Sequence, residues 1–217
     1  MKELLFLQLK LEIRNQSILT SLFLYLVCLV FIIYLTIGNQ PTSQSPAIWS
    51  ALFWMTLLFT TVNTIAKSFI PYKPDSGPYM YSIVSAEQII LAKIFYGFVL
   101  NTLIGCIGFI LFSTLLKNPI EDLWLFLGTL LLASYGFSAS LTLLSGIASK
   151  ANNNSVVMAV LSFPVIIGIL LMVIKMTRHA SDGLEIDASY NELITIAAIN
   201  ILVTAVSYLL FPYIWRS

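Results

Sequence analysis

Long apolar segments separated by short polar stretches make up almost the whole chain. An α-helix needs about 20 residues to cross roughly 30 Å of hydrocarbon. Six segments reach this length, and we place them at residues 17–37, 47–66, 88–116, 123–147, 155–174 and 193–214. The pattern predicts an all-α integral membrane protein with six transmembrane helices in a single domain, residues 1–217.

The first 16 residues mix leucines with regularly spaced charges. Strict alternation over residues 7–14 is typical of a strand, whereas the residue types there, Leu, Lys, Glu, Gln and Arg, favour a helix. We interpret residues 1–16 as a helix that lies in the membrane interface. A cytosolic extension of the first transmembrane helix is the alternative. The charges before the first apolar segment also argue against a cleavable signal peptide.

The distribution of Lys and Arg predicts the orientation of the chain. An even number of transmembrane helices places both termini on one side, and that side is richer in positive charge. It carries Lys2, Lys10, Arg14, Lys67, Lys73, Lys93, Lys150 and Arg216, against Lys117, Lys175 and Arg178 on the other. Because positively charged loops stay in the cytoplasm, we expect cytoplasmic termini and an external loop at residues 175–192.

Composition supports a membrane protein and excludes several other classes. The chain is 59% hydrophobic and 10% charged, whereas soluble domains carry about 25% charged residues. A net charge of +1 provides no basic surface for nucleic acid. Cys28 and Cys106 lie in apolar segments without a C-x-x-C spacing, so we expect neither a disulfide nor a metal pair.

The polar residues within the apolar segments suggest packing rather than catalysis. No ionisable residue lies deep in a segment, and no phosphate-binding loop of the G-x-x-x-x-G-K-[ST] type is present. Any nucleotide energy must therefore come from another chain, and we predict no catalytic residue. We expect interhelical hydrogen bonds from the amides and close packing from the hydroxyls. The amides are Asn63, Asn101 and Asn200, and the hydroxyls are Ser134, Ser138 and Thr142.

His179 and Pro164 each allow two interpretations. His179 is the only histidine, in the external loop; a metal or haem role is conceivable, and a solvated side chain is the commoner case. The motif for covalent c-type haem attachment, C-x-x-C-H, is absent. Pro164 removes a backbone hydrogen bond from the fifth segment, and Gly168 follows one turn later. The pair is either a hinge or a static kink.

The longest polar interruption, residues 67–93, is the best candidate for contact with a soluble partner. It contains Pro71, Pro74 and Pro78, charges of both signs, and several tyrosines. The prolines predict a break after about residue 69, followed by a short helix that leads into the third segment. Ser85 and Gln88 have the spacing of a capping box. An ordinary cytoplasmic loop is the alternative, although its aromatic residues favour a partner or the membrane interface.

The chain resembles the CcmB family, also called haem exporter protein B. The resemblance extends over nearly the whole length and the six-helix organisation. It rests on LKLEIRNQ before the first segment, PAIWSALFWMTLLF in the second, Asp75-Ser76-Gly77 followed by IILAK, and SVVMAVLSFPVIIGILLM in the fifth. The chain departs from the family in the loop around Asp75, which has fewer acidic residues and no proline after Pro78, and in lacking a second proline near Pro164.

The resemblance implies an ABC-2-type permease subunit of the bacterial inner membrane. Such a permease forms a homodimer and works with two copies of a separate ATPase, CcmA, and with the haem-handling proteins CcmC, CcmD and CcmE. Residues 67–87 would be the coupling loop, and residues 175–192 a periplasmic loop. The residues that would contact the ATPase are Lys73, Asp75, Gly77, Tyr79, Tyr81, Glu87 and Lys93. ATP would be bound by the partner, with haem as a possible cargo and no cofactor held by this chain.

Two other functions remain open from the sequence. An ABC-2-type permease could carry another cargo, such as a lipid or a drug, and the sequence marks no substrate path. An ATP-independent carrier or membrane scaffold belongs to a different class. That class predicts polar constellations within the membrane or repeat symmetry, and the sequence shows neither clearly.

Overall fold

The computed structural model describes residues 16–38, 45–66, 86–148, 154–183 and 186–216, and all regular structure in them is helical. Six helices are long and apolar enough to cross a membrane. They are α2 (Gln16–Ile37), α3 (Pro46–Ala66), α5 (Ala86–Leu115), α6 (Leu123–Ala148), α7 (Asn154–Ser181) and α8 (Tyr190–Arg216). The prediction of six membrane-spanning helices is therefore confirmed. The predicted interfacial helix at residues 1–16 and the segment 67–85 fall outside the described residues.

The predicted external loop at residues 175–192 is much shorter in the structure. Helix α7 continues to Ser181 and α8 begins at Tyr190, with the short 3-10 helix η2 (Ile186–Ser189) between them. Hydrophobic length indicates where a helix leaves the hydrocarbon, whereas backbone conformation decides where the helix ends. Here α7 is followed by Gly183 at a φ of 62°, a left-handed conformation typical of helix C-termini.

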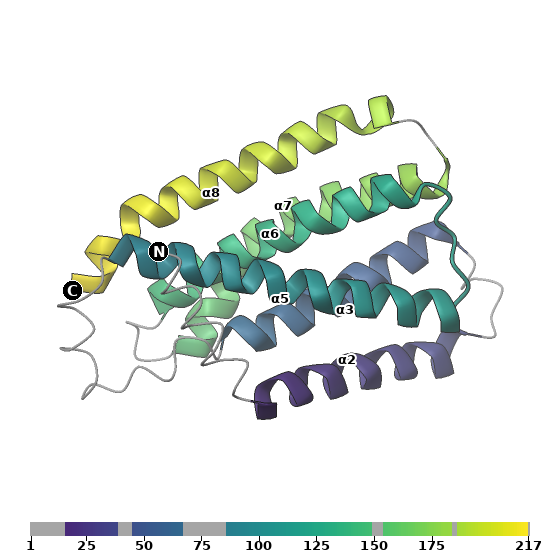
Figure 1. The fold of residues 1–217 in the computed structure, drawn as a ribbon, viewed down its shortest axis with the longest axis horizontal. Coiled ribbons are helices and arrows are strands. Elements are labelled where there is room, and N and C mark those ends of the chain that lie inside the picture. Colours follow the sequence, from purple (N-terminus) through teal and green to yellow (C-terminus); the bar gives the residue numbers. More distant parts are fainter. Residues whose placement is uncertain (1–15, 39–44, 67–85, 149–153, 184–185, 217) are drawn as a thin grey trace.

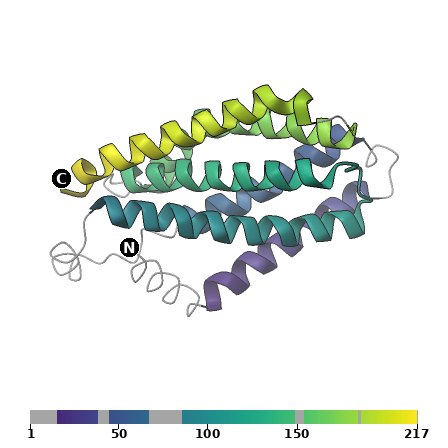
Figure 2. The same cartoon turned by 45° about the horizontal axis from the view of Figure 1, so that its top comes forward.

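Helix α6 forms the centre of the bundle, and α2 and α8 lie at its edges. Figures 1 and 2 show α8 along one side and α2 along the opposite side, with the other helices between them. Within the apolar span of each helix, 78% of α6 residues are buried, against 17% in both α2 and α8. Because α6 contacts α3, α5, α7 and α8, a movement of any of these helices changes its packing.

The two ends of the bundle differ in their packing. We call the end where α2 begins and α8 ends the terminal end, and the other the opposite end. Towards the opposite end, aromatic rings from α3, α5 and α6 form one buried cluster. Its centroid distances range from 4.6 Å for Phe109 and Phe126 to 6.4 Å for Trp54 and Phe137. The cluster includes Trp49, Phe53, Trp54, Phe109, Phe112, Phe126 and Phe137. Edge-to-face contacts of this kind favour one fixed arrangement of the three helices.

Candidate functional site

The start of α5 is the described region nearest to the predicted partner-contact segment. Five of the seven predicted contact residues, in the segment 73–81, lie outside the described residues. Glu87 lies in the first turn of α5 and is partly exposed. Lys93 lies about 10 Å further along the helix, and only 5% of it is exposed. Glu87 can face a partner at this surface, whereas Lys93 is buried in this chain.

The first turns of α5 are packed directly onto α6 and α8. Ile89, Ile90 and Ile94 belong to a second buried cluster at the terminal end. The α6 and α8 members of this cluster are Ala139, Leu143, Val203 and Phe211. Between membrane helices such contacts act through van der Waals packing rather than through the hydrophobic effect. A force applied to the start of α5 therefore acts immediately on α6 and α8.

A little further along, α5 and α6 approach each other closely. A Cβ built on Gly97 would lie 2.3 Å from Oγ of Ser138. The Ser138 hydroxyl donates to the backbone carbonyl of Ile94 over 2.7 Å. Two turns later, a Cβ on Gly105 would lie 2.7 Å from Cδ1 of Leu130. Small residues at this spacing let helix backbones approach closely.

The sequence predicted that the serines and the threonine of α6 occupy close-packed positions, and this is confirmed. Ser134, Ser138 and Thr142 are all buried within the bundle. The two close-packed glycines of α5 were not predicted: Gly97 faces Ser138, and Gly105 faces Leu130. Gly97 and Gly105 lie eight residues apart on one face of α5, and this spacing is the sequence signal that could have revealed the contact.

The three asparagines differ in their partners. Oδ1 of Asn101 accepts a hydrogen bond from Thr61 of α3 at 3.0 Å, and Nδ2 of Asn200 donates to the carbonyl of Leu132 in α6 at 3.0 Å. Both bonds are interhelical, as predicted. For Asn63 the prediction is wrong, because its amide is exposed and donates to the carbonyl of Phe59 in its own helix at 3.0 Å.

Asn101 lies between Gly97 and Gly105 in α5, and Ser134 lies between Leu130 and Ser138 in α6. Nδ2 of Asn101 and Oγ of Ser134 are both buried and have no hydrogen-bond partner in the described part of the chain. The middle of the α5–α6 contact is therefore less tightly fixed by hydrogen bonds than the Ser138 contact.

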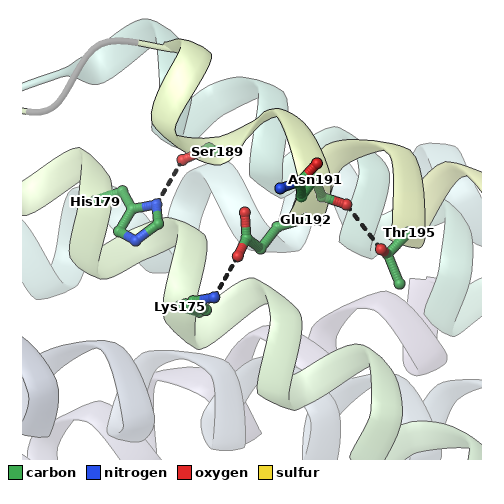
Figure 3. A network of polar contacts seen from close by, with 6 residues as sticks. All are labelled: Lys175, His179, Ser189, Asn191, Glu192 and Thr195. Atoms are coloured by element: carbon green, nitrogen blue, oxygen red, sulfur yellow. Dashed lines mark hydrogen bonds and ion pairs between the residues drawn. The ribbon is translucent and has the colours of Figure 1, made fainter.

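A polar network at the opposite end joins α7 to η2 and α8 (Figure 3). Nδ1 of His179 lies 2.8 Å from Oγ of Ser189, and Lys175 forms an ion pair with Glu192. His179 is therefore held by a neighbouring helix rather than simply solvated. In the described residues no three His, Cys, Asp or Glu side chains gather closely enough to hold a metal ion. The network is suited to fixing the α7–α8 corner.

Pro164 and Gly168 lie in one uninterrupted helix. Pro164 is exposed and within α7, and a Cβ built on Gly168 would meet no atom within 4 Å. The glycine is therefore not needed for close packing inside this chain. Its lack of a packing role leaves backbone flexibility as one reason for a glycine at this position.

Comparison with family models matches residues 1–211 to the model described as CcmB protein. The match includes all six membrane-spanning helices up to the last turns of α8, and the whole of the segment between α3 and α5. Comparison with individual curated proteins gives no match.

Proposed function

Because the chain belongs to the CcmB family, we propose that it is the transmembrane permease subunit of an ABC transporter for haem export and cytochrome c maturation. The observation that carries this proposal is the family match over residues 1–211. The six membrane-spanning helices agree with a permease. The chemistry of ATP hydrolysis belongs to a separate, CcmA-like subunit.

The packing at the start of α5 supports a coupling role for the segment that precedes it. An ATPase that pulls or pushes residues 67–87 acts on a helix of 30 residues, about 45 Å long. Ile89, Ile90 and Ile94 pass that movement to α6 and α8. In this proposal the ATPase contacts Glu87 and the residues Lys73, Asp75, Gly77, Tyr79 and Tyr81. Lys93, the last of the predicted contact residues, is buried in the single chain.

The aromatic cluster at the opposite end supports a movement that starts at the terminal end of the bundle. Its rings fix α3, α5 and α6 to one another, whereas the buried cluster at the terminal end is mostly aliphatic, with Phe211 as its one buried aromatic residue. Movement driven from the terminal end therefore tilts the helices about the aromatic cluster. Pro164 and Gly168 act as the hinge that lets α7 follow.

The wider assembly follows from the family. We propose a permease homodimer in the bacterial inner membrane, with cytoplasmic termini, two CcmA-like ATPases, and CcmC-, CcmD- and CcmE-like partners. The cargo is haem, or the haem-loaded chaperone that the cycle releases.

Co-purification tests the proposed contact with the ATPase. The tagged chain is extracted in mild detergent from its native cells, and its partners are identified by mass spectrometry. In one variant residues 73–81 are replaced by Gly/Ser. In a control, residues 39–44, which link α2 and α3 in the sequence, are replaced in the same way. Membrane insertion and abundance are first shown to be equal in all three proteins.

We expect an ATPase subunit with the wild type and with the 39–44 control, and its loss with the 73–81 variant. Recovery of the ATPase with all three proteins would contradict the coupling role of the segment. The absence of an ATPase from all three, under conditions that preserve other membrane complexes, would contradict the ABC transporter itself.

A further inference from the structure

One face of α5 packs against α3 and α6, which also contact each other. At two levels along this face, a Cβ built on a glycine of α5 would meet one side chain of α3 and one of α6. These side chains are Ile65 and Ser138 at Gly97, and Leu57 and Leu130 at Gly105. Between the two levels each of the three helices advances by eight residues. The helices therefore keep a constant register over the turns that separate these levels.

The residues midway between the two levels are polar in all three helices. They are Asn101 in α5, Thr61 in α3 and Ser134 in α6, and the register places them in one layer. An independent contact supports this register, because the Thr61 hydroxyl donates to Oδ1 of Asn101 over 3.0 Å. None of the three residues is more than 1% exposed. The three helices thus enclose a polar layer.

Two polar atoms of this layer are not satisfied by the helices around it. Nδ2 of Asn101 and Oγ of Ser134 are buried and have no hydrogen-bond partner in the described part of the chain. Other buried hydroxyls, such as those of Thr60 and Thr129, donate to the backbone carbonyl four residues earlier at 2.8 Å, and Ser134 does not. Because an unpaired polar group is costly in hydrocarbon, both atoms need a partner.

The depth and chemistry of the layer indicate what this partner is. Asn101 lies at the middle of α5, about 22 Å from either end of the helix. Bulk water is absent from hydrocarbon at this depth, so the partner must be bound specifically. A water molecule can accept two hydrogen bonds and donate two, and buried waters typically make about three bonds to groups that are otherwise unsatisfied.

We propose that the layer binds one water molecule between α3, α5 and α6. The water accepts hydrogen bonds from Nδ2 of Asn101 and from the Ser134 hydroxyl, and it donates to Oγ1 of Thr61, an oxygen with lone pairs that can accept. A water can reorient as the helices shift, whereas the direct bond from Ser138 to Ile94 is fixed in geometry. The site is a property of the bundle and does not depend on the identity of the cargo.

Contact between water and the Asn101 side chain tests this proposal in the full-length chain. The protein carries ¹⁵N in its asparagine side chains, and transfer from water protons to these amides is measured by solid-state NMR in lipid bilayers. The signal that is lost in Asn101→Leu, or in Asn101→Ala if the first variant does not fold, belongs to Asn101. Equal abundance and elution volume are shown first for all variants.

Two serine variants of α6 provide the comparison. Ser134→Ala removes one partner of the water. Ser140→Ala is the matched control, because Ser140 is also buried and has no hydrogen-bond partner in the described residues, but lies outside the layer. We expect transfer from water to the Asn101 amide in the wild type and in Ser140→Ala, and weaker transfer in Ser134→Ala.

Unfolding in SDS measures whether Asn101 and Ser134 act together. Ser134→Ala should shift the unfolding equilibrium about threefold towards the unfolded state, the effect of one hydrogen bond between membrane helices, and should have no effect in the Asn101→Leu background. Absence of transfer to the Asn101 amide in the wild type would overturn the proposal, as would equal transfer in the two serine variants. Coupling of the two substitutions without transfer from water would indicate a direct hydrogen bond and also overturn it.

Discussion

The close approach of α5 and α6 at Gly97 predicts a large and site-specific cost for a larger side chain there. The Ser138 hydroxyl lies 2.3 Å, and its Cβ 3.3 Å, from the position of a Cβ on Gly97. Gly97→Leu therefore requires the helices to separate and the bond from Ser138 to Ile94 to break. Gly128 of α6 is a matched control, since a Cβ there meets no atom within 4 Å.

The expected free energies of unfolding follow from three contributions. Overpacking costs about 1–3 kcal/mol, and Gly97→Leu belongs near the upper limit because its neighbour is a short side chain close to the backbone. The lost interhelical hydrogen bond adds about 0.6 kcal/mol. Replacing glycine in a helix returns about 1 kcal/mol, at both sites. Gly97→Leu should thus be destabilised by roughly 2 kcal/mol and Gly128→Leu unchanged or slightly stabilised.

Unfolding by SDS titration, followed by tryptophan fluorescence in mixed micelles, measures this difference. Ser138→Gly in the Gly97→Leu background removes the opposing side chain and should restore part of the loss. Equal stability of Gly97→Leu and Gly128→Leu would refute the close contact. A double variant less stable than Gly97→Leu alone would refute the assignment of the clash to Ser138.

Three further predictions concern the opposite end and the hinge. At the α7–α8 corner, Lys175→Ala should lower stability more than Glu192→Gln. The first variant leaves the Glu192 carboxylate, 8% exposed, without its cation, whereas the second leaves Lys175, which is 59% exposed and can be solvated. Equal losses of stability in the same SDS titration would contradict this prediction. Trp54→Phe removes the 2.8 Å hydrogen bond to Thr177 and should lower the free energy of unfolding by about 0.6 kcal/mol, against about 3–5 kcal/mol for Trp54→Ala. A similar loss for both variants would show that the hydrogen bond, rather than ring packing, carries the stabilisation. Gly168→Ala should leave stability unchanged or higher while lowering c-type cytochrome content in native cells, and unchanged cytochrome content would argue against the hinge.

The sequence predicts the helices of this protein well but not the faces that they bury. In α2, Leu24 is 63% exposed and Leu26 is 3% exposed, although both are leucines two residues apart. In a soluble helix the exposed position would be polar, and the pattern would reveal the buried face. In a membrane both lipid and core accept leucine, so this signal is lost.

The helix ends and the candidate site show the same limit in different ways. The end of α7 depends on Gly183, beyond the hydrophobic segment that marks the span, so the loop from residue 175 was predicted too long. Lys93 was predicted to contact a partner, and nothing in the sequence indicated that only 5% of it is exposed in this chain. The family itself could be identified, because its residues are spread over the whole chain and occur in order.

Measurement of c-type cytochromes in native cells that lack this chain tests the central claim most directly. Membrane proteins are separated by electrophoresis and stained for covalently bound haem, with b-type cytochromes measured by difference spectra in the same membranes. We predict that c-type cytochromes disappear, that b-type cytochromes persist, and that the wild-type chain but not the 73–81 Gly/Ser variant restores the c-type bands. Normal c-type cytochromes in the cells without the chain would contradict the assignment to cytochrome c maturation.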